Sequence, residues 1–214
     1  MGGVTTYYNK YVNEMKEKQK KRLAPLQLVS KIEEFLVKEF ANFVISESSG
    51  KDFVLTNYGC KGEPRIDMCF ITGEHKKPYI YGMLEAKYFR NIHRITEVSK
   101  ARDELSGGLN SLHKQIGNYP KDKHCDLEVR LNSKENRIYG MVFASHVTYK
   151  EKKDSDCNEF FDIICNKAKS KFVFYDLKDQ NPRLDTVYER EEVQVLGNTA
   201  YATLKVGLWV KKQE

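Results

Sequence analysis

Two carboxylates and a lysine stand at a spacing that suits metal-ion chemistry. Asp67 lies in the run EPRIDMCF (63–70), and Glu85 and Lys87 lie in the run YIYGMLEAKYF (79–89). If these runs form adjacent strands, the two carboxylates and the ammonium come to the same edge of a sheet. Carboxylate oxygens are preferred ligands of a hard divalent cation, and an ammonium one strand step away can orient a water molecule and stabilise charge. The three residues therefore predict a Mg²⁺ or Mn²⁺ site.

The strands that carry these residues are expected to be buried. Apolar or β-forming residues surround Asp67, and residues 79–84 (YIYGML) indicate a central strand before Glu85. Glu85 and Lys87 are two residues apart, so they project to one face, while Ala86 points to the opposite, packed face. The alternatives are a solvent-facing carboxylate at Asp67 and a surface ion pair between Glu85 and Lys87. We favour the metal site, because a carboxylate near a sheet interior needs a cationic partner.

The elements that position these residues can be assigned from hydrophobic patterns. Residues 7–22 are polar and lysine-rich with helical character, and Pro25 is expected to end this segment. An amphipathic helix is expected from Leu26 to Phe43, because its apolar residues recur at three- and four-residue steps. These residues are Val29, Ile32, Leu36, Phe40 and Phe43. Three strands are expected next, at residues 43–46, 65–72 and 79–88, with a polar turn at 73–78.

The second half of the chain is also expected to contain both helices and strands. A helical region is expected at residues 96–118, broken near Gly107 and Gly108 and stopped by Pro120, and a charged loop should follow at 120–136. The later elements are expected to be a buried strand at 138–147, a helix at 159–168, a strand at 171–177, and a half-buried strand at 200–210 after a turn at Gly197 and Asn198.

The motif and the order of elements together resemble the PD-(D/E)XK nuclease superfamily. Its signature is an acidic residue that ends one strand and a Glu-x-Lys on the next, as in Asp67 and Glu85-Ala86-Lys87, although Pro64 does not directly precede Asp67 here. The expected order of helix, three strands, helix, strand, helix and strand resembles the αβββαβ core of the restriction-endonuclease-like fold. The resemblance covers about residues 26–176. It implies an α/β fold with a central mixed β-sheet flanked by helices, and extra C-terminal strands.

The resemblance also implies site residues on two helices. A glutamate of the first helix often joins the site in this superfamily. At about 100° per residue, Glu33 falls beside the apolar stripe, Glu34 falls on the solvated side and Glu39 stays near the stripe, so Glu33 is preferred and the other two remain open. Gln115 and Tyr119, one helical turn apart, resemble the Q-x-x-x-Y element of RecB-type nucleases, in which the glutamine supports the active site and the tyrosine assists substrate contact. Core packing is the alternative for Tyr119.

Roles for the remaining residues follow from the same resemblance. Asp67, Glu85 and the carbonyl of Ala86, with Glu33, would bind Mg²⁺ or Mn²⁺, and Lys87 would contact the attacking water or the scissile phosphate. Basic residues after the Glu-x-Lys run form a candidate nucleic-acid-binding track, although a solvated surface explains them equally well. They are Arg90, Arg94, Lys100 and Arg102.

Composition limits the class of protein. The chain has 214 residues and a formal net charge of +6, which fits one domain and permits attraction to a polyanion. Five cysteines form no C-x-x-C pair, no apolar signal segment follows the N-terminus, and no stretch has the length of a membrane span. We therefore expect a cytoplasmic protein with no membrane contact. Dispersed histidines argue against a zinc site, and the lack of a glycine-rich phosphate loop argues against an ATP motor.

These observations predict a domain organisation and a function. Residues 1–25 form a basic N-terminal segment, residues 26–176 form the nuclease-like core, and residues 177–214 form a β extension of the same domain. The expected function is that of a divalent-metal-dependent nuclease, an endo- or exodeoxyribonuclease, with DNA favoured over RNA as the substrate and the choice between them open. The alternative is a catalytically silent nuclease-fold module that binds nucleic acid or a protein partner. A homodimer and a larger defence or repair complex both remain open.

Overall fold

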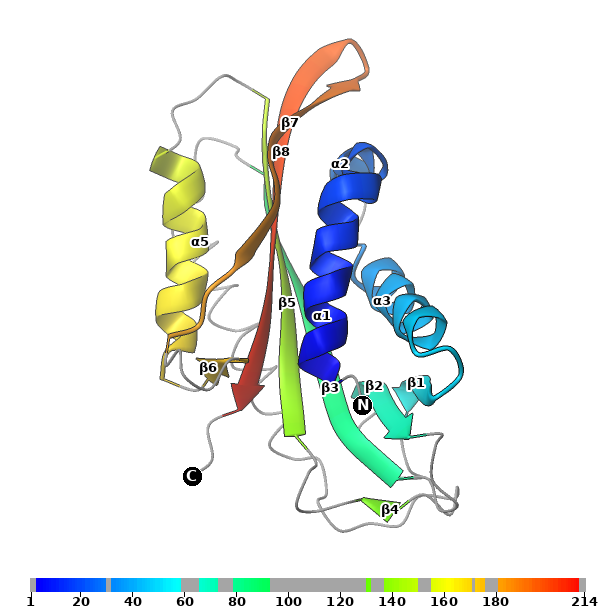
Figure 1. Cartoon of the computed structure of the whole chain (residues 1–214). Coiled ribbons are helices and arrows are strands. Elements are labelled where there is room, and N and C mark those ends of the chain that lie inside the picture. The colour runs from blue at the N-terminus through cyan, green and yellow to red at the C-terminus, as the bar shows by residue number, and fades with distance from the viewer. Residues whose placement is uncertain are drawn as a thin grey trace.

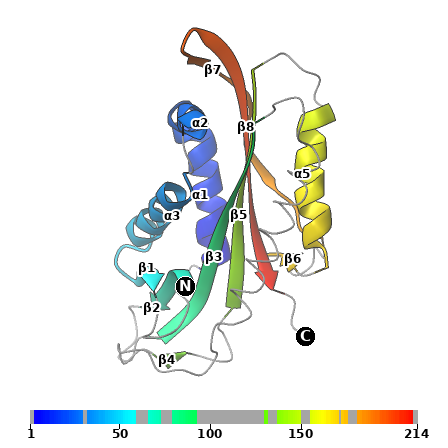
Figure 2. The same ribbon diagram turned by 180° about the vertical axis from the view of Figure 1, so that it is seen from behind.

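The computed structural model has helices on both faces of one mixed sheet. It describes residues 3–29, 32–58, 66–72, 79–92, 130–131, 137–149, 155–170, 172–175 and 181–211. Within these residues, three helices near the N-terminus cover one face of the sheet and a later helix covers the other (Figures 1 and 2). The helices are α1 (Val4–Glu14), α2 (Lys20–Val29), α3 (Glu33–Glu47) and α5 (Ser155–Ala168), and a π-helical segment (Met15–Gln19) joins α1 to α2.

The described strands form an eight-stranded sheet. They are β1 (Asp52–Tyr58), β2 (Ile66–Thr72), β3 (Tyr79–Ile92), β4 (Arg130–Leu131), β5 (Arg137–Thr148), β6 (Phe172–Phe174), β7 (Asp185–Val195) and β8 (Asn198–Lys211). The order is β1-β2-β3-β5-β8-β6, with β4 beside β3 and β7 beside β8. Strands β3 and β5 are parallel, while β1–β2, β2–β3 and β5–β8 are antiparallel. The predicted α/β class with a mixed sheet flanked by helices is therefore confirmed.

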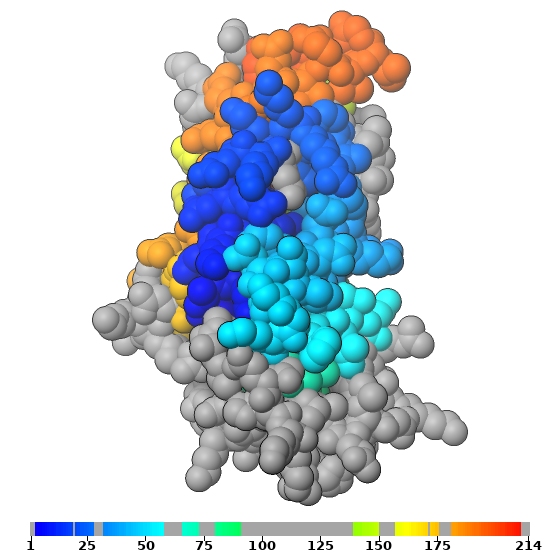
Figure 3. All heavy atoms as spheres, turned by 45° about the vertical axis from the view of Figure 1, so that its right-hand side comes forward, coloured from blue at the N-terminus to red at the C-terminus, as the bar shows by residue number. Residues whose placement is uncertain are grey.

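The N-terminal segment buries more apolar surface than its lysine content suggests. Tyr7, Tyr8, Tyr11, Val12 and Met15 are all at most 5% exposed, and their spacing places them on one side of a helix. They share a core cluster with α3 and with the sheet. Figure 3 shows the N-terminal helices and α3 as a continuous surface over this face, with the β7–β8 hairpin above them.

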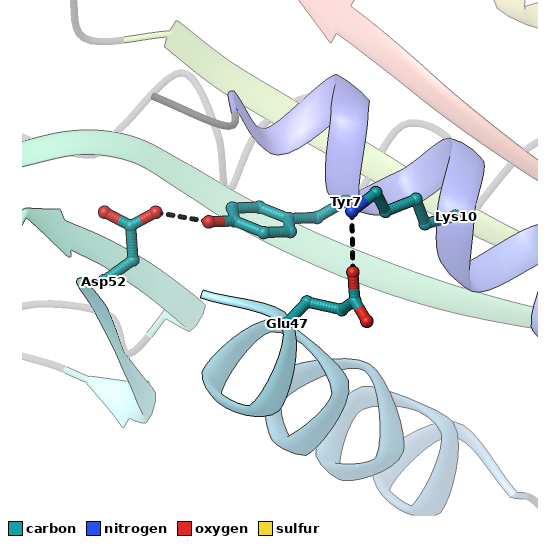
Figure 4. A network of polar contacts seen from close by, with 4 residues as sticks. All are labelled: Tyr7, Lys10, Glu47 and Asp52. Carbon is teal, nitrogen blue, oxygen red and sulfur yellow. Dashed lines mark hydrogen bonds and ion pairs between the residues drawn. The ribbon is translucent and has the colours of Figure 1, made fainter. Parts of the chain in front are cut away.

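Two polar contacts link α1 to the last residue of α3 and the first residue of β1 (Figure 4). The hydroxyl of Tyr7 donates to Oδ2 of Asp52 at 2.6 Å, and Nζ of Lys10 lies 2.7 Å from Oε2 of Glu47. Asp52 is 6% exposed, whereas the Lys10 side chain is 56% exposed. The first contact therefore satisfies a buried carboxylate, and the second contributes little to stability.

A second core lies on the opposite face, under α5. Phe160 and Ile164 of α5 pack there against Phe172, Phe174 and Trp209 of the sheet. The period of apolar residues along α5 explains this contact, because its buried residues recur at three- and four-residue steps. Strand β8 contributes to both cores, since alternate residues point to alternate faces.

Several predicted elements agree with the structure. The strands predicted at 65–72, 79–88, 138–147 and 171–177 correspond to β2, β3, β5 and β6, and the helix predicted at 159–168 corresponds to α5. The turn between β7 and β8, the predicted C-terminal strand, lies at Leu196 and Gly197, one residue before the predicted pair, because Asn198 is the first residue of β8. The turn predicted at 73–78, the helical region at 96–118 and most of the loop at 120–136 lie outside the described residues, and residues 130–131 of that loop form β4.

Two predictions near the first helix are wrong. Residues 43–46 are not a strand but the last turn of α3, because Val44 continues the buried helix face of Phe40 at a four-residue step. Pro25 does not end a helix but lies inside α2. Burial of Leu23, Ala24 and Gln27, each at most 1% exposed, keeps the chain helical despite the missing N–H of the proline. The predicted helix at 26–43 is therefore divided between α2 and α3.

Candidate metal and phosphodiester site

Strands β2 and β3 stop pairing where the carboxylates begin. Their last paired residues are Met68 and Leu84. One step further, the N–H of Asp67 donates to Oε2 of Glu85 at 3.3 Å, and the N–H of Ala86 donates to Oδ2 of Asp67 at 2.7 Å. Side-chain oxygens thus take the place of backbone carbonyls along this part of the sheet, and the two carboxylates meet at one edge of β3.

Glu33 reaches the same edge from α3. Its Oε2 accepts a hydrogen bond of 2.6 Å from the N–H of Tyr88, two residues beyond Ala86 on β3. Glu33 is the first residue of α3, where a carboxylate is favoured by the partial positive charge of the helix end. Ile32 before it is 3% exposed and fixes the start of the helix in the core. Three acidic side chains therefore lie along one edge of β3.

The other two candidate glutamates of α3 make ion pairs instead of contacts with β3. Oε1 of Glu34 is 2.7 Å from Nζ of Lys38, and both side chains are more than half exposed. Oε2 of Glu39 is 3.4 Å from the guanidinium of Arg22 on α2. Glu33 is thus the glutamate of α3 that contacts β3, while its role as a metal ligand stays a prediction.

Burial raises the pKa values of the two central carboxyls, and like charge adds to the effect at Glu85. Glu85 is 5% exposed, and burial, reinforced by the negative charge of Asp67 and opposed by Lys87, raises its pKa to about 8. Burial also raises the pKa of Asp67, against the opposing effects of the Ala86 N–H and the Lys87 charge. Positive charge added here would favour the ionised form of both groups. Burial therefore favours the protonated form of both carboxyls in the absence of such a charge.

Lys87 and Ala86 lie on opposite faces of β3. Ala86 is fully buried in the core cluster formed with α1, α2 and α3. Lys87 is half-buried and shares its face with Glu85, since side chains two apart in a strand point the same way. Its charge acts on both Asp67 and Glu85. The carbonyl of Ala86 as a ligand, and Lys87 as a contact to water or phosphate, stay predictions.

A pocket beside this edge contains residues that the sequence alone did not single out. It is lined by Glu33, Glu34, Val37, Lys38, Thr56, Asn57 and Asp67. Strand β1, which supplies Thr56 and Asn57, was not predicted. The run DFVLTNY (52–58) is rich in β-forming residues and follows the turn former Gly50, so this composition was the available signal.

The remaining predicted site residues have different outcomes. Gln115 and Tyr119 lie outside the described residues, as do Arg94, Lys100 and Arg102. Arg90 lies on β3, paired in register with Ser145 of β5, and it shares the strand face of Ala86 and Tyr88 rather than that of Glu85.

The donor chemistry of the site fits a hard divalent cation. Carboxylates at Glu33, Asp67 and Glu85 are the oxygen ligands that Mg²⁺ and Mn²⁺ prefer. In the part of the chain that the structure describes, no group of three His, Cys, Asp or Glu side chains is arranged to hold a metal ion. Oδ2 of Asp67 and Oε2 of Glu33 accept hydrogen bonds from the backbone of β3, which leaves the second oxygen of each carboxylate as a potential ligand.

Among the described residues, no helix is long and apolar enough to cross a membrane. The chain finds no match among protein-family models, curated proteins or solved structures.

Proposed function

We propose that this protein is a divalent-metal-dependent nuclease with a restriction-endonuclease-like core, hydrolysing phosphodiester bonds in DNA rather than RNA. The observation that carries the proposal is the meeting of Asp67 and Glu85 at the edge of β3, where pairing with β2 stops and Lys87 shares the face of Glu85. The order α3, β1, β2, β3, then β5 parallel to β3, α5 and β6 supports it.

The residues of the candidate site would have different roles in the proposed reaction. Asp67 and Glu85, with Glu33 and the carbonyl of Ala86, would hold Mg²⁺ or Mn²⁺. A bound ion supplies a Lewis acid for the phosphoryl oxygens and lowers the pKa of a coordinated water. Lys87 contributes a fixed positive charge that stabilises the negative charge accumulating on the phosphate. Burial of Glu85 strengthens each of these electrostatic interactions, because the surrounding dielectric is low.

The charge of the whole chain is compatible with a nucleic-acid substrate. The formal net charge of +6 attracts a polyanion. At 0.1 M salt this attraction extends over a Debye length of about 10 Å. Cleavage should therefore slow as salt is raised, since fewer phosphate contacts survive.

An activity screen tests the proposal directly. The purified protein is incubated with linear, nicked, branched and single-stranded DNA and with RNA, in Mg²⁺, Mn²⁺ or EDTA, and the products are mapped. We expect cleavage of DNA with either ion and none in EDTA. Asp67→Ala and Lys87→Ala should each lower the rate by roughly 10²-fold or more, the scale of losing one electrostatic contact in a reacting site.

A matched pair of α3 variants serves as control. Glu33→Gln should reduce cleavage, whereas Glu47→Gln, at the exposed C-terminal end of the same helix, should leave it unchanged. Wild-type cleavage by Asp67→Ala or Lys87→Ala would contradict the proposal. A protein that binds DNA without cutting it, and whose Tm does not rise with Mn²⁺, would instead be a silent nuclease-fold module.

A further inference from the structure

The backbone of β1 is irregular directly opposite Asp67. Asn57 has a φ of 57°, in the left-handed region that non-glycine residues seldom adopt. The register of β1 and β2 pairs Thr56 with Met68 and Tyr58 with Ile66, but it contains no pair between Asn57 and Asp67. Asp67 is therefore outside the ladder on both of its sides, towards β1 as well as towards β3.

The irregular residue lines the pocket beside the carboxylates. Asn57 and Thr56 are exposed and line the same pocket as Glu33 and Asp67. Ser49, Arg190 and Leu196 are the other described non-glycine residues with positive φ, and none of them lines this pocket. This left-handed position therefore lies at the candidate site, and asparagine is one of the few non-glycine residues that adopt it readily.

The residue type suits contact with a phosphate. A pocket with carboxylates on one side repels an anion unless neutral or positive donors face it. Lys38 also lines the pocket, but its ammonium is 2.7 Å from the carboxylate of Glu34, which offsets its charge. The amide of Asn57 offers two N–H donors without competing with a cation for the carboxylates.

We propose that Asn57 is a substrate-positioning residue whose side-chain amide donates to a phosphate oxygen of the bound DNA strand, in the pocket between α3 and strands β1 and β2. This inference rests on the proposed nuclease function. Its contribution is to binding and orientation, so the effect should fall on Kd and KM more than on kcat.

Binding of a labelled DNA duplex in Ca²⁺, followed by fluorescence anisotropy, is the primary test because it does not depend on cleavage. Asn57→Gly keeps the left-handed backbone accessible while removing the amide. We expect its Kd to rise about tenfold, the scale of one hydrogen bond to a charged group. Asn57→Asp keeps the side-chain shape but presents a charge that repels phosphate, so its Kd should rise further. Leu196→Gly, at another left-handed position, should bind as wild type does.

The outcomes separate this inference from the proposed function. Equal Kd values for wild type and Asn57→Gly would overturn the role of Asn57, and so would a wild-type protein that binds no DNA. A wild-type protein that binds DNA but does not cut it in Mn²⁺ would contradict the proposed nuclease function. The role of Asn57 in binding would then still be decided by the Kd of Asn57→Gly. In an active enzyme, a rise in KM with kcat within about twofold supports positioning. A loss of the Mn²⁺-induced rise in Tm in Asn57→Gly would overturn it, because the residue would then act on the ion.

Discussion

At the scale of single residues, Glu85 combines deep burial with a neighbouring negative charge. Burial is the larger cause of its raised pKa, and the charge of Asp67 adds to it, while Lys87 acts in the opposite direction. A carboxyl group of this kind is costly to ionise in the folded chain. The cost is a property of the site itself, and it can be measured without any substrate.

Glu85 should make the protein less stable as pH rises. Its pKa is about 8 in the folded chain and near 4.5 as an unperturbed glutamate, so between these values the folded state holds a proton that the unfolded state has lost. The free energy of unfolding should therefore fall between pH 5 and 8, by up to a few kcal/mol. Urea unfolding in EDTA at several pH values measures this slope. Glu85→Gln should flatten it and Glu47→Gln should not; an equally steep fall in Glu85→Gln would count against a titrating Glu85.

At the scale of elements, loss of the contact between α1 and β1 should lower the free energy of unfolding by a measurable amount. Tyr7→Phe removes the donor to Asp52 and leaves a buried carboxylate oxygen without that bond. We expect it to lower the free energy of unfolding by about 1–2 kcal/mol. Lys10→Ala breaks the neighbouring contact with Glu47, which is exposed, and should cost less than about 0.5 kcal/mol. Chemical denaturation of both variants checks the contrast, and equal losses would contradict it.

Elements with a strong period of their own could be predicted from the sequence, and those shaped by tertiary packing could not. The alternation in β8 and the long apolar run of β5 identify those strands without further information. The end of α3 and the whole of β1 were missed. Residues 43–46 suit both a helix and a strand, and only packing on the core selects the helix.

The same distinction applies to the candidate site. The spacing of Asp67 and Glu85 is local to a pair of adjacent strands, so sequence patterns were enough to expect them at one edge. The position of Asn57 depends on a left-handed backbone and on an interrupted β1–β2 ladder, and neither leaves a clear pattern in the sequence.

At the scale of the whole molecule, the two cores share the sheet between them. Strand β8 contributes Leu208 and Val210 to the core under the N-terminal helices and Trp209 to the core under α5. A substitution that destabilises the packing on one face should therefore also destabilise the packing on the other face, because both cores include side chains of β8. We expect the described layers to unfold together.

Trp209 provides the measurement of this cooperativity. It is the single tryptophan of the chain and is fully buried on the α5 face. Its fluorescence and the far-UV circular dichroism should report one denaturation midpoint. Tyr7→Phe, on the opposite face, should move both midpoints by the same amount. Transitions that separate in this variant would show that the two layers unfold independently.

The break in pairing between β2 and β3 also has a mechanical consequence. From Met68 to Ile71 the two strands are joined by backbone ladder contacts, whereas at Asp67 they are joined through flexible side chains. The spacing of β2 and β3 at this point therefore depends on the conformation of two carboxylate side chains, and a rotation of either one would change it without breaking a backbone-to-backbone bond.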